Sequence, residues 1–205
     1  MTIRFHRNDL PDLDHYQVDA VAIDTETLGL RPHRDRLCVV QLSPGDGTAD
    51  VVQIDAGQKK APNLVALLKN RKIAKLFHYA RFDVAVLYNA FGVMADPVFC
   101  TKIASRLTRT YTDRHGLKDL CNELIGVSLS KAQQSSDWAA KDLSPEQLEY
   151  AASDVLYLHQ LRDKLLERLQ RENRLREAEA CFRFLPTRAR LDLMGWEEED
   201  IFAHS

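Results

Sequence analysis

The chain has 205 residues, of which 45% are apolar and 28% charged, and its formal net charge is −2. This length accommodates one domain of medium size with a sizeable core, and the composition is that of a soluble globular protein. The charge excludes the overall basic excess of many proteins that bind long nucleic acids, so a site for a polyanion must be local.

The four cysteines, at positions 38, 100, 121 and 181, form no C-x-x-C pair, which argues against zinc and redox motifs. Cys38 and Cys100 stand in apolar surroundings and are predicted to be buried thiols, so a reducing, cytoplasmic setting fits best. The N-terminus has no apolar signal core, and no apolar run approaches the ~20 residues that a membrane span needs. No membrane partner is therefore expected.

The first part of the chain is predicted to be a β-meander. Apolar runs at 18–24, 36–43 and 50–55 have the character of buried strands. A segment rich in turn residues, 28–35, joins the first two, and a tight glycine turn at 45–47 joins the last two. Three consecutive strands connected in this way indicate an antiparallel arrangement.

The rest of the chain is predicted to be mainly helical. Helices are expected at 62–69, 80–91, 101–109 and 116–125, with a strand at 72–77. Ser144-Pro-Glu-Gln147 is a strong helix start, and that helix is expected to run to about residue 170. We therefore predict one α/β domain with a mixed sheet over about 1–170, followed by a helical C-terminal extension over about 171–205.

Asp24 and Glu26 are two residues apart at the end of the first predicted strand. The period of a strand places both side chains on one face, where two carboxylates repel unless a cation lies between them. Alone, this pair is better explained as two exposed acids. Asp83 opens a predicted helix, and alone it is better explained by the favourable field at a helix N-terminus.

Tyr150 and Asp154 are four residues apart on the helix that begins after Ser144, so they project from the same face. Their neighbours are largely apolar, which places Asp154 at the border of the core. An acid there costs free energy unless it has a partner or a metal. Here a functional role becomes as good an explanation as a structural one.

Together the four carboxylates offer hard oxygen ligands of the kind that Mg²⁺ and Mn²⁺ prefer. Two such ions about 3.5–4 Å apart can stabilise the attacking and the leaving oxygens of a phosphoryl displacement. Tyr150 is in position to orient or deprotonate the attacking water. Its ordinary pKa of about 10 means that a metal would have to do most of the acidifying.

The order and context of these residues resemble the DEDD superfamily of 3′→5′ exonucleases, which have a ribonuclease H-like fold. The resemblance implies that Asp24, Glu26, Asp83 and Asp154 bind two divalent metal ions, Mg²⁺ or Mn²⁺, and that Tyr150 completes the catalytic set. In the histidine subclass a His stands five residues before the last Asp. This chain has Glu149 there and Tyr150 one position later, as in the tyrosine (DEDDy) subclass that includes ribonuclease D.

Further stretches are similar to ribonuclease D catalytic domains, namely 116–120, 131–138 and the segment that begins at Leu143. Ribonuclease D adds C-terminal helical RNA-binding (HRDC) domains, and none is expected here, since the chain ends about fifty residues after Asp154. The segments 24–30 and 108–116 and the C-terminal stretch are similar to the NrnC family. That resemblance implies a nano-RNase that clears dinucleotides and very short RNAs and assembles as a ring-shaped octamer.

Residues 101–118 carry five basic side chains against one acid. A solvated loop would explain this, but arginines and hydroxyl donors suit phosphate oxygens, and a local patch suits the terminal phosphate of a small substrate. The candidate phosphate ligands in this segment are Arg109, Tyr111, Arg114 and His115.

Thr25, between the two predicted metal-binding acids, is a further candidate substrate-binding residue. Three other residues are open to two interpretations. Leu28 could bind substrate by wedging between the last two bases, as in related exonucleases, or pack under its loop. His78 could orient substrate or be a structural histidine. Trp138 could stack on a base, although core packing is the better explanation.

The function predicted is hydrolysis of dinucleotides and very short RNA, and possibly DNA, to 5′-mononucleotides. A ribonuclease D-like enzyme that trims the 3′ ends of tRNA or other long RNA is the nearest alternative. An inactive nucleic-acid-binding module is a weaker one, because all five residues of the site are present.

Overall fold

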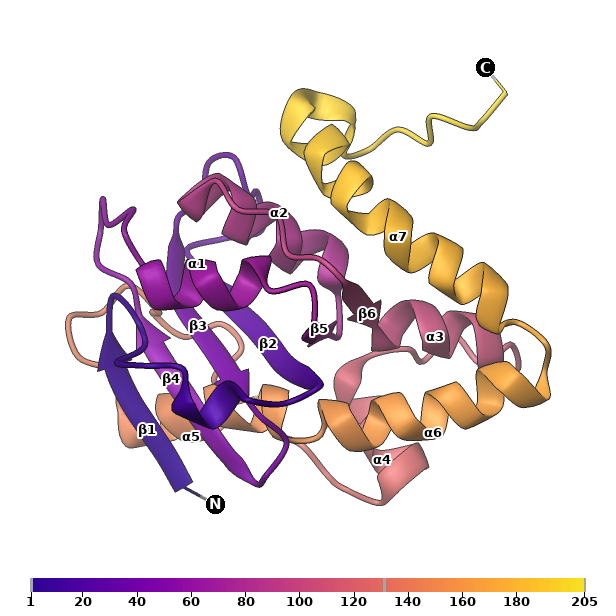
Figure 1. Ribbon diagram of the computed structural model, residues 1–205, viewed down its shortest axis with the longest axis horizontal. Helices are drawn as coiled ribbons and strands as arrows, with labels where there is room; N and C mark the ends of the chain where they lie inside the picture. Colours follow the sequence, from indigo (N-terminus) through magenta and orange to yellow (C-terminus); the bar gives the residue numbers. More distant parts are fainter. Residues whose placement is uncertain (1, 131, 205) are drawn as a thin grey trace.

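The computed structural model describes residues 2–130 and 132–204, and it contains a six-stranded mixed sheet (Figure 1). In spatial order the strands are β1 (Thr2–Arg7), β4 (Thr48–Gln53), β3 (Leu37–Ser43), β2 (Ala20–Thr27), β5 (Ala74–Phe77) and β6 (Val98–Cys100). β2, β3 and β4 form the predicted antiparallel meander, whereas β1, β5 and β6 run parallel to their neighbours. Lys131 and Ser205, which belong to stretches quoted above, lie outside the described residues.

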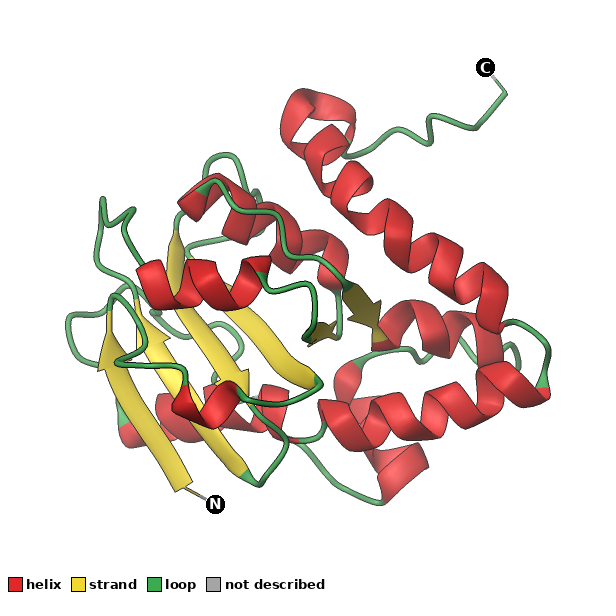
Figure 2. Cartoon of the chain, viewed as in Figure 1, coloured by secondary structure: helices red, strands yellow, loops and turns green. Residues whose placement is uncertain are grey.

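The helices cover the sheet and build a C-terminal helical part (Figure 2). They are α1 (Pro62–Lys69), α2 (Ala80–Phe91), α3 (Thr101–Thr108), α4 (Leu117–Ile125), α5 (Pro145–Leu156), α6 (Leu158–Arg171) and α7 (Leu175–Leu191), with short helical turns η1 (Asp14–Tyr16) and η2 (Asp192–Trp196). α5 packs on β1 to β4, and α2 packs on β2, β3, β5 and β6. α3, α6 and α7 contact one another, and α4 packs against α6.

The two faces of the sheet bury different apolar clusters. On β4, Val51 belongs to a small cluster with Trp138 and Ala151 of α5, and the next residue, Val52, belongs to the main core. Successive strand residues point to opposite faces, so this alternation places α5 on one face and the main core on the other. β3 is buried along its whole length, as expected of a strand covered on both faces.

The predicted helix start at Ser144 is confirmed. Ser144 caps α5, and Gln147 completes a capping box with it. Gly92 ends α2 in the left-handed conformation, with φ of 66°. Ser144 thus sets where α5 begins, and Gly92 sets where α2 ends. These two helices carry three of the five predicted site residues.

The single helix predicted from Ser144 to about residue 170 is wrong. The structure has two helices that meet at Tyr157 (φ −105°, ψ −4°). The two helices pack on different elements. α5 lies on β1 to β4, whereas α6 packs mainly on α3, α4 and α7. One straight helix could not follow both surfaces. The strands β1 and β6 were not predicted.

The predicted buried thiols are confirmed, because Cys38 and Cys100 are both buried and free. Among the described residues, no helix has the length and apolar character that crossing a bilayer requires.

A buried carboxylate joins β1 to β4. Asp50 is 2% exposed and accepts hydrogen bonds from Arg4 Nε and Nη2 (2.8 Å each) and from the Tyr16 hydroxyl (2.6 Å), with His6 Nε2 at 2.7 Å. Burial opposes ionisation of Asp50, but these partners outweigh it and hold its pKa below the ordinary value. An edge strand of modest apolar content is thereby fixed to the sheet.

We predict that Asp50→Ala lowers the free energy of unfolding by about 3 kcal/mol, because it leaves the buried Tyr16 hydroxyl and the half-buried Arg4 and His6 side chains without their partner. The difference in unfolding free energy between wild type and variant is largest above the ordinary Asp pKa of 3.8. It decreases as the pH falls through the lowered folded-state pKa of Asp50. Urea unfolding at several pH values measures it. Exposed Glu179→Ala is the control, and a loss no larger than in that control contradicts the structural role of Asp50.

Candidate active site

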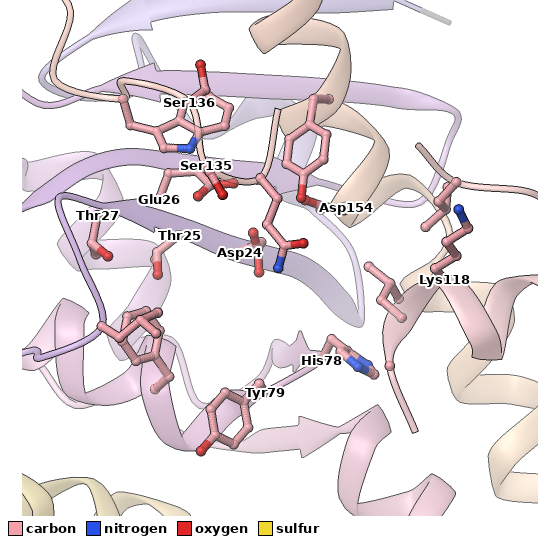
Figure 3. Close-up of a pocket in the computed structure, with 18 of the residues that line it drawn as sticks. Asp24, Thr25, Glu26, Thr27, His78, Tyr79, Lys118, Ser135, Ser136 and Asp154 are labelled. Carbon is pink, nitrogen blue, oxygen red and sulfur yellow. The ribbon is translucent and has the colours of Figure 1, made fainter. Parts of the chain in front are cut away.

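Three of the predicted carboxylates meet at one end of the sheet. Asp24 and Glu26 lie on β2 and Asp154 lies on α5, and oxygens from all three are within 4.8 Å of one another. Figure 3 shows the three side chains converging on the same side of the cavity. Gln41, which faces Asp24 across the β2–β3 pair, donates a hydrogen bond to it (3.1 Å). Spacing of two on a strand and position on a facing helix therefore bring distant acids together.

Asp83 approaches from the other side of β2. It is 3% exposed, lies in the first turn of α2, and accepts a hydrogen bond from Thr25 Oγ1 (2.7 Å). Thr25 alternates with Asp24 and Glu26 along the strand, so it faces α2 while they face α5. The structure thus places Asp83 next to the three-carboxylate cluster, joined to it through Thr25.

The electrostatics of the cluster are unfavourable without a cation. Burial raises the pKa of Asp24 to about 7. Burial, followed by the charges of Asp24, Asp154 and Asp83, raises the pKa of Glu26 to about 10. The pKa values of Asp83 and Asp154 are also raised, by burial first and by the charge of Asp24 second. Carboxylates in such surroundings suit a hard divalent cation, which would supply the missing positive charge.

Tyr150 stands one helical turn before Asp154 on α5. Burial, with the charges of Asp154, Glu26 and Asp24, raises the pKa of its hydroxyl above the ordinary value of 10.0. Its ring packs against Trp138, with centroids 5.9 Å apart. Trp138 is buried, which agrees with its predicted packing role, although it also lines the cavity. Tyr150 is therefore a protonated phenol in a fixed position.

The cluster opens into a cavity of about 630 Å³. Its apolar side includes Leu28, Leu30, Tyr79, Phe82 and Leu129, its polar side includes Ser130 and Gln134 to Ser136, and Lys102 and Lys118 supply positive charge. In Figure 3, Ser135 and Ser136 lie on the side of Glu26, with His78 and Tyr79 across the cavity from them. The cavity thus combines acids, lysines and apolar side chains, which is what a small phosphate-linked ligand would require.

Three of the residues predicted to bind substrate line this cavity, namely Thr25, Leu28 and His78. His78 Nδ1 lies 2.9 Å from Thr101 Oγ1, and burial lowers the pKa of the ring to about 3, so the imidazole is neutral. Leu30, which is 85% exposed, also lines the cavity and was not predicted. The signal was available, because Leu30 is the second apolar residue after the acids.

The four predicted phosphate ligands between 109 and 115 do not line the cavity. Arg109 is 1% exposed, pairs with Glu123, and donates to Ser105 Oγ (3.0 Å). The Tyr111 hydroxyl also donates to Glu123. His115 Nδ1 lies 2.9 Å from the same Ser105 oxygen, and the Arg114 carbonyl accepts from Arg109.

Lys102 and Lys118 are the members of this basic segment that reach the cavity. Counting charges along the sequence could not show that Glu123 pairs with Arg109.

The comparisons with known proteins agree with this geometry. The chain matches the 3′-5′ exonuclease family over residues 12–170. Brucella melitensis NrnC is 76% identical, with a TM-score of 0.98 over the whole of both chains. Structures of that protein bound to pGG (76% identical) and with bound Mg²⁺ (75%) match over the same extent, with TM-scores of 0.98 and 0.97.

More distant relatives are larger proteins. Escherichia coli RNase D is 28% identical, with a TM-score of 0.75 over 85% of this chain and 46% of that one. Ribonuclease D of Gluconacetobacter diazotrophicus is 38% identical over 76% of this chain but only 39% of its own length. The chain therefore corresponds to about two fifths of the curated relatives it matches.

We predict that Glu26→Gln stabilises the metal-free protein by at least about 1 kcal/mol at neutral pH. With its pKa raised to about 10, Glu26 must take up a proton when the metal-free protein folds, and the neutral amide removes that cost, since displacing a pKa by one pH unit corresponds to about 1.4 kcal/mol. The same change should reduce the stabilisation that Mn²⁺ gives the wild type. Thermal unfolding in chelator and in Mn²⁺ measures both effects, with exposed Glu179→Gln as control. A destabilised variant that still responds fully to Mn²⁺ contradicts the metal-site interpretation.

Proposed function

The chain belongs to the 3′-5′ exonuclease family, as a relative of NrnC, and on that basis we propose that it hydrolyses dinucleotides and very short oligoribonucleotides to 5′-mononucleotides. The observation that carries this proposal is the position of the acid cluster inside a cavity of about 630 Å³. That volume is typical of pockets that hold one small molecule, ~300–1,000 Å³. The structure of B. melitensis NrnC bound to pGG, at 76% identity, supports the same substrate class.

Asp24, Glu26, Asp83 and Asp154 would hold two divalent metal ions, Mg²⁺ or Mn²⁺. The convergence of three of these side chains within 4.8 Å and the raised pKa values of all four support this assignment. Bound ions of this kind lower the pKa of water and offset the negative charge of the phosphate. The structure of B. melitensis NrnC with bound Mg²⁺ supports the choice of metal.

Tyr150 would orient the attacking water. Its raised pKa keeps the proton on the phenol at neutral pH, so the hydroxyl serves as a hydrogen-bonding group and is not a preformed base. Asp154 shares its helix face, and Trp138 limits the movement of its ring. A fixed hydroxyl beside the carboxylates would restrict the water to the direction required for attack on phosphorus.

The remaining walls of the cavity would recognise the two ends of a short substrate. Leu28, Leu30 and Phe82 offer apolar contacts for bases. Lys102 lies over the Tyr79 ring, with Nζ 4.4 Å from its centroid, and Lys118 stands at the start of α4. We assign the terminal phosphate to these two lysines, in place of the four residues at 109–115.

We further propose that the protein is a homo-oligomer, a ring-shaped octamer by resemblance to NrnC, and that it works in the cytoplasm. Large apolar side chains are exposed at the C-terminal end, including Met194, Ile201 and Phe202. Such a patch suits burial against another copy. Three buried free cysteines fit a reducing compartment.

We predict that Asp24→Ala abolishes hydrolysis of a 5′-phosphorylated dinucleotide while the fold is kept. Tyr150→Phe should lower kcat by ~10²-fold or more, as expected when a hydroxyl that orients the attacking water is lost. Mononucleotide release in Mg²⁺ and circular dichroism provide the two measurements, with Glu179→Ala as the matched control. Full activity of Asp24→Ala would remove the basis of the proposed site.

We also predict that the rate falls steeply with substrate length. Dinucleotides, seven-mers and a tRNA 3′ tail are compared at equal concentration, each with Mg²⁺ and with chelator. The small volume of the cavity, about 630 Å³, favours the dinucleotide, and chelator should stop every reaction. Equal rates at all lengths would favour a ribonuclease D-like trimming enzyme, and binding without any product would favour an inactive module.

A further inference from the structure

The helix-start motif Ser144–Gln147 does more than cap a helix. Gln147 is 6% exposed, and its side-chain Oε1 accepts a hydrogen bond from the Ser144 backbone N–H (2.9 Å). The backbone N–H of Gln147 in turn donates to Ser144 Oγ (3.2 Å). This is the complete capping box of α5. It uses only the oxygen of the Gln147 side chain, and a glutamate would serve equally well.

The amide nitrogen of Gln147 makes two further contacts outside the helix. Nε2 donates to Ser136 Oγ (2.7 Å) and to the Asp137 carbonyl (3.1 Å). Both acceptors belong to residues 134–138, which we call the wall segment. An ionised carboxylate could still accept a hydrogen bond from the Ser136 hydroxyl, but it could not make the contact with the Asp137 carbonyl, because it has no hydrogen to donate. The side-chain NH₂ group of Gln147 therefore makes contacts that helix capping does not require.

The wall segment forms one side of the cavity. Gln134, Ser135, Ser136 and Trp138 all line it. Inside the segment the backbone makes only short-range turns, such as Trp138 N to Ser136 O (3.0 Å). Within the described part of the chain, the hydrogen bonds that join residues 134–138 to another helix or strand are the two from Gln147.

The same side chain therefore connects the wall to the catalytic helix. Gln147 precedes Tyr150 by three residues on α5, and Trp138, at the end of the wall segment, packs on the Tyr150 ring. If the wall moves away from α5, Tyr150 loses its packing partner and the cavity changes shape. Misplacement of reacting groups by ~1 Å can cost ~10²-fold in rate.

We propose that Gln147 is a positioning residue, whose side-chain amide holds the wall segment against α5 and so fixes Tyr150 and the substrate cavity. The inference rests on the proposed function for its effect on rate, and on the hydrogen bonds above for its effect on the wall. Gln147 touches neither the carboxylates nor the cavity, and it acts through Ser136, Asp137 and Trp138.

The test compares three variants. Gln147→Glu keeps the capping oxygen and removes the donor, Gln147→Ala removes both, and Ser144→Ala removes the cap hydroxyl and keeps the donor. Kinetics with a 5′-phosphorylated dinucleotide are measured at a temperature where circular dichroism shows each variant folded. We expect kcat/KM to fall on the order of tenfold or more in both Gln147 variants. Ser144→Ala should stay within about twofold of wild type, although it loses ~1 kcal/mol of stability.

A second readout reports on the wall without any catalysis. The chain has two tryptophans, so Trp196→Phe leaves Trp138 as the only indole fluorophore. In this background, acrylamide quenching of Trp138 should rise in Gln147→Glu and Gln147→Ala and stay unchanged in Ser144→Ala. Unchanged quenching in the Gln147 variants overturns the inference, as does equal loss of kcat/KM in Gln147→Glu and Ser144→Ala.

The two proposals fail in different ways. If the wild type releases no mononucleotide, the proposed function fails, and the quenching data still decide whether Gln147 holds the wall. If the wild type is active and both Gln147 variants keep its kcat/KM, the positioning role is wrong and the proposed function stands.

Discussion

The mutual repulsion of half-buried carboxylates is the constraint on which the rest of the structure depends. Asp24, Glu26 and Asp154 have oxygens within 4.8 Å of one another, and burial makes each charge harder to solvate. A chain would not adopt this arrangement without compensation. The apolar core holds β2 and α5 together, and a divalent cation would convert the repulsion into binding energy.

The architecture follows from the need to bring these acids together from distant parts of the sequence. β2 is central in the sheet, and α5 and α2 pack on its two faces. The break at Tyr157 lets α5 follow the sheet while α6 follows the helical part. Neighbouring polar residues then hold the site residues in position. Gln41 donates a hydrogen bond to Asp24, and Thr25 donates one to Asp83. Gln147 holds the wall segment beside Tyr150.

Local periodicity paired the candidate site residues, and the resemblance to the DEDD exonucleases joined them into one predicted site. A spacing of two on a strand and of four on a helix put Asp24 with Glu26 and Tyr150 with Asp154, and the meander and most helices followed from apolar patterns and cap residues. What could not be predicted depends on contacts between distant residues. β1 is held by its pairing with β4 and by Asp50, and Arg109 is neutralised by Glu123, fourteen residues away. The cavity wall at 134–138 also has no periodic signal.

The proposal that the four carboxylates bind two divalent metal ions is tested most directly by anomalous diffraction from crystals of the protein soaked in Mn²⁺. We expect two peaks about 3.5–4 Å apart, coordinated by Asp24, Glu26, Asp83 and Asp154. No peak among these carboxylates at saturating Mn²⁺ would contradict it.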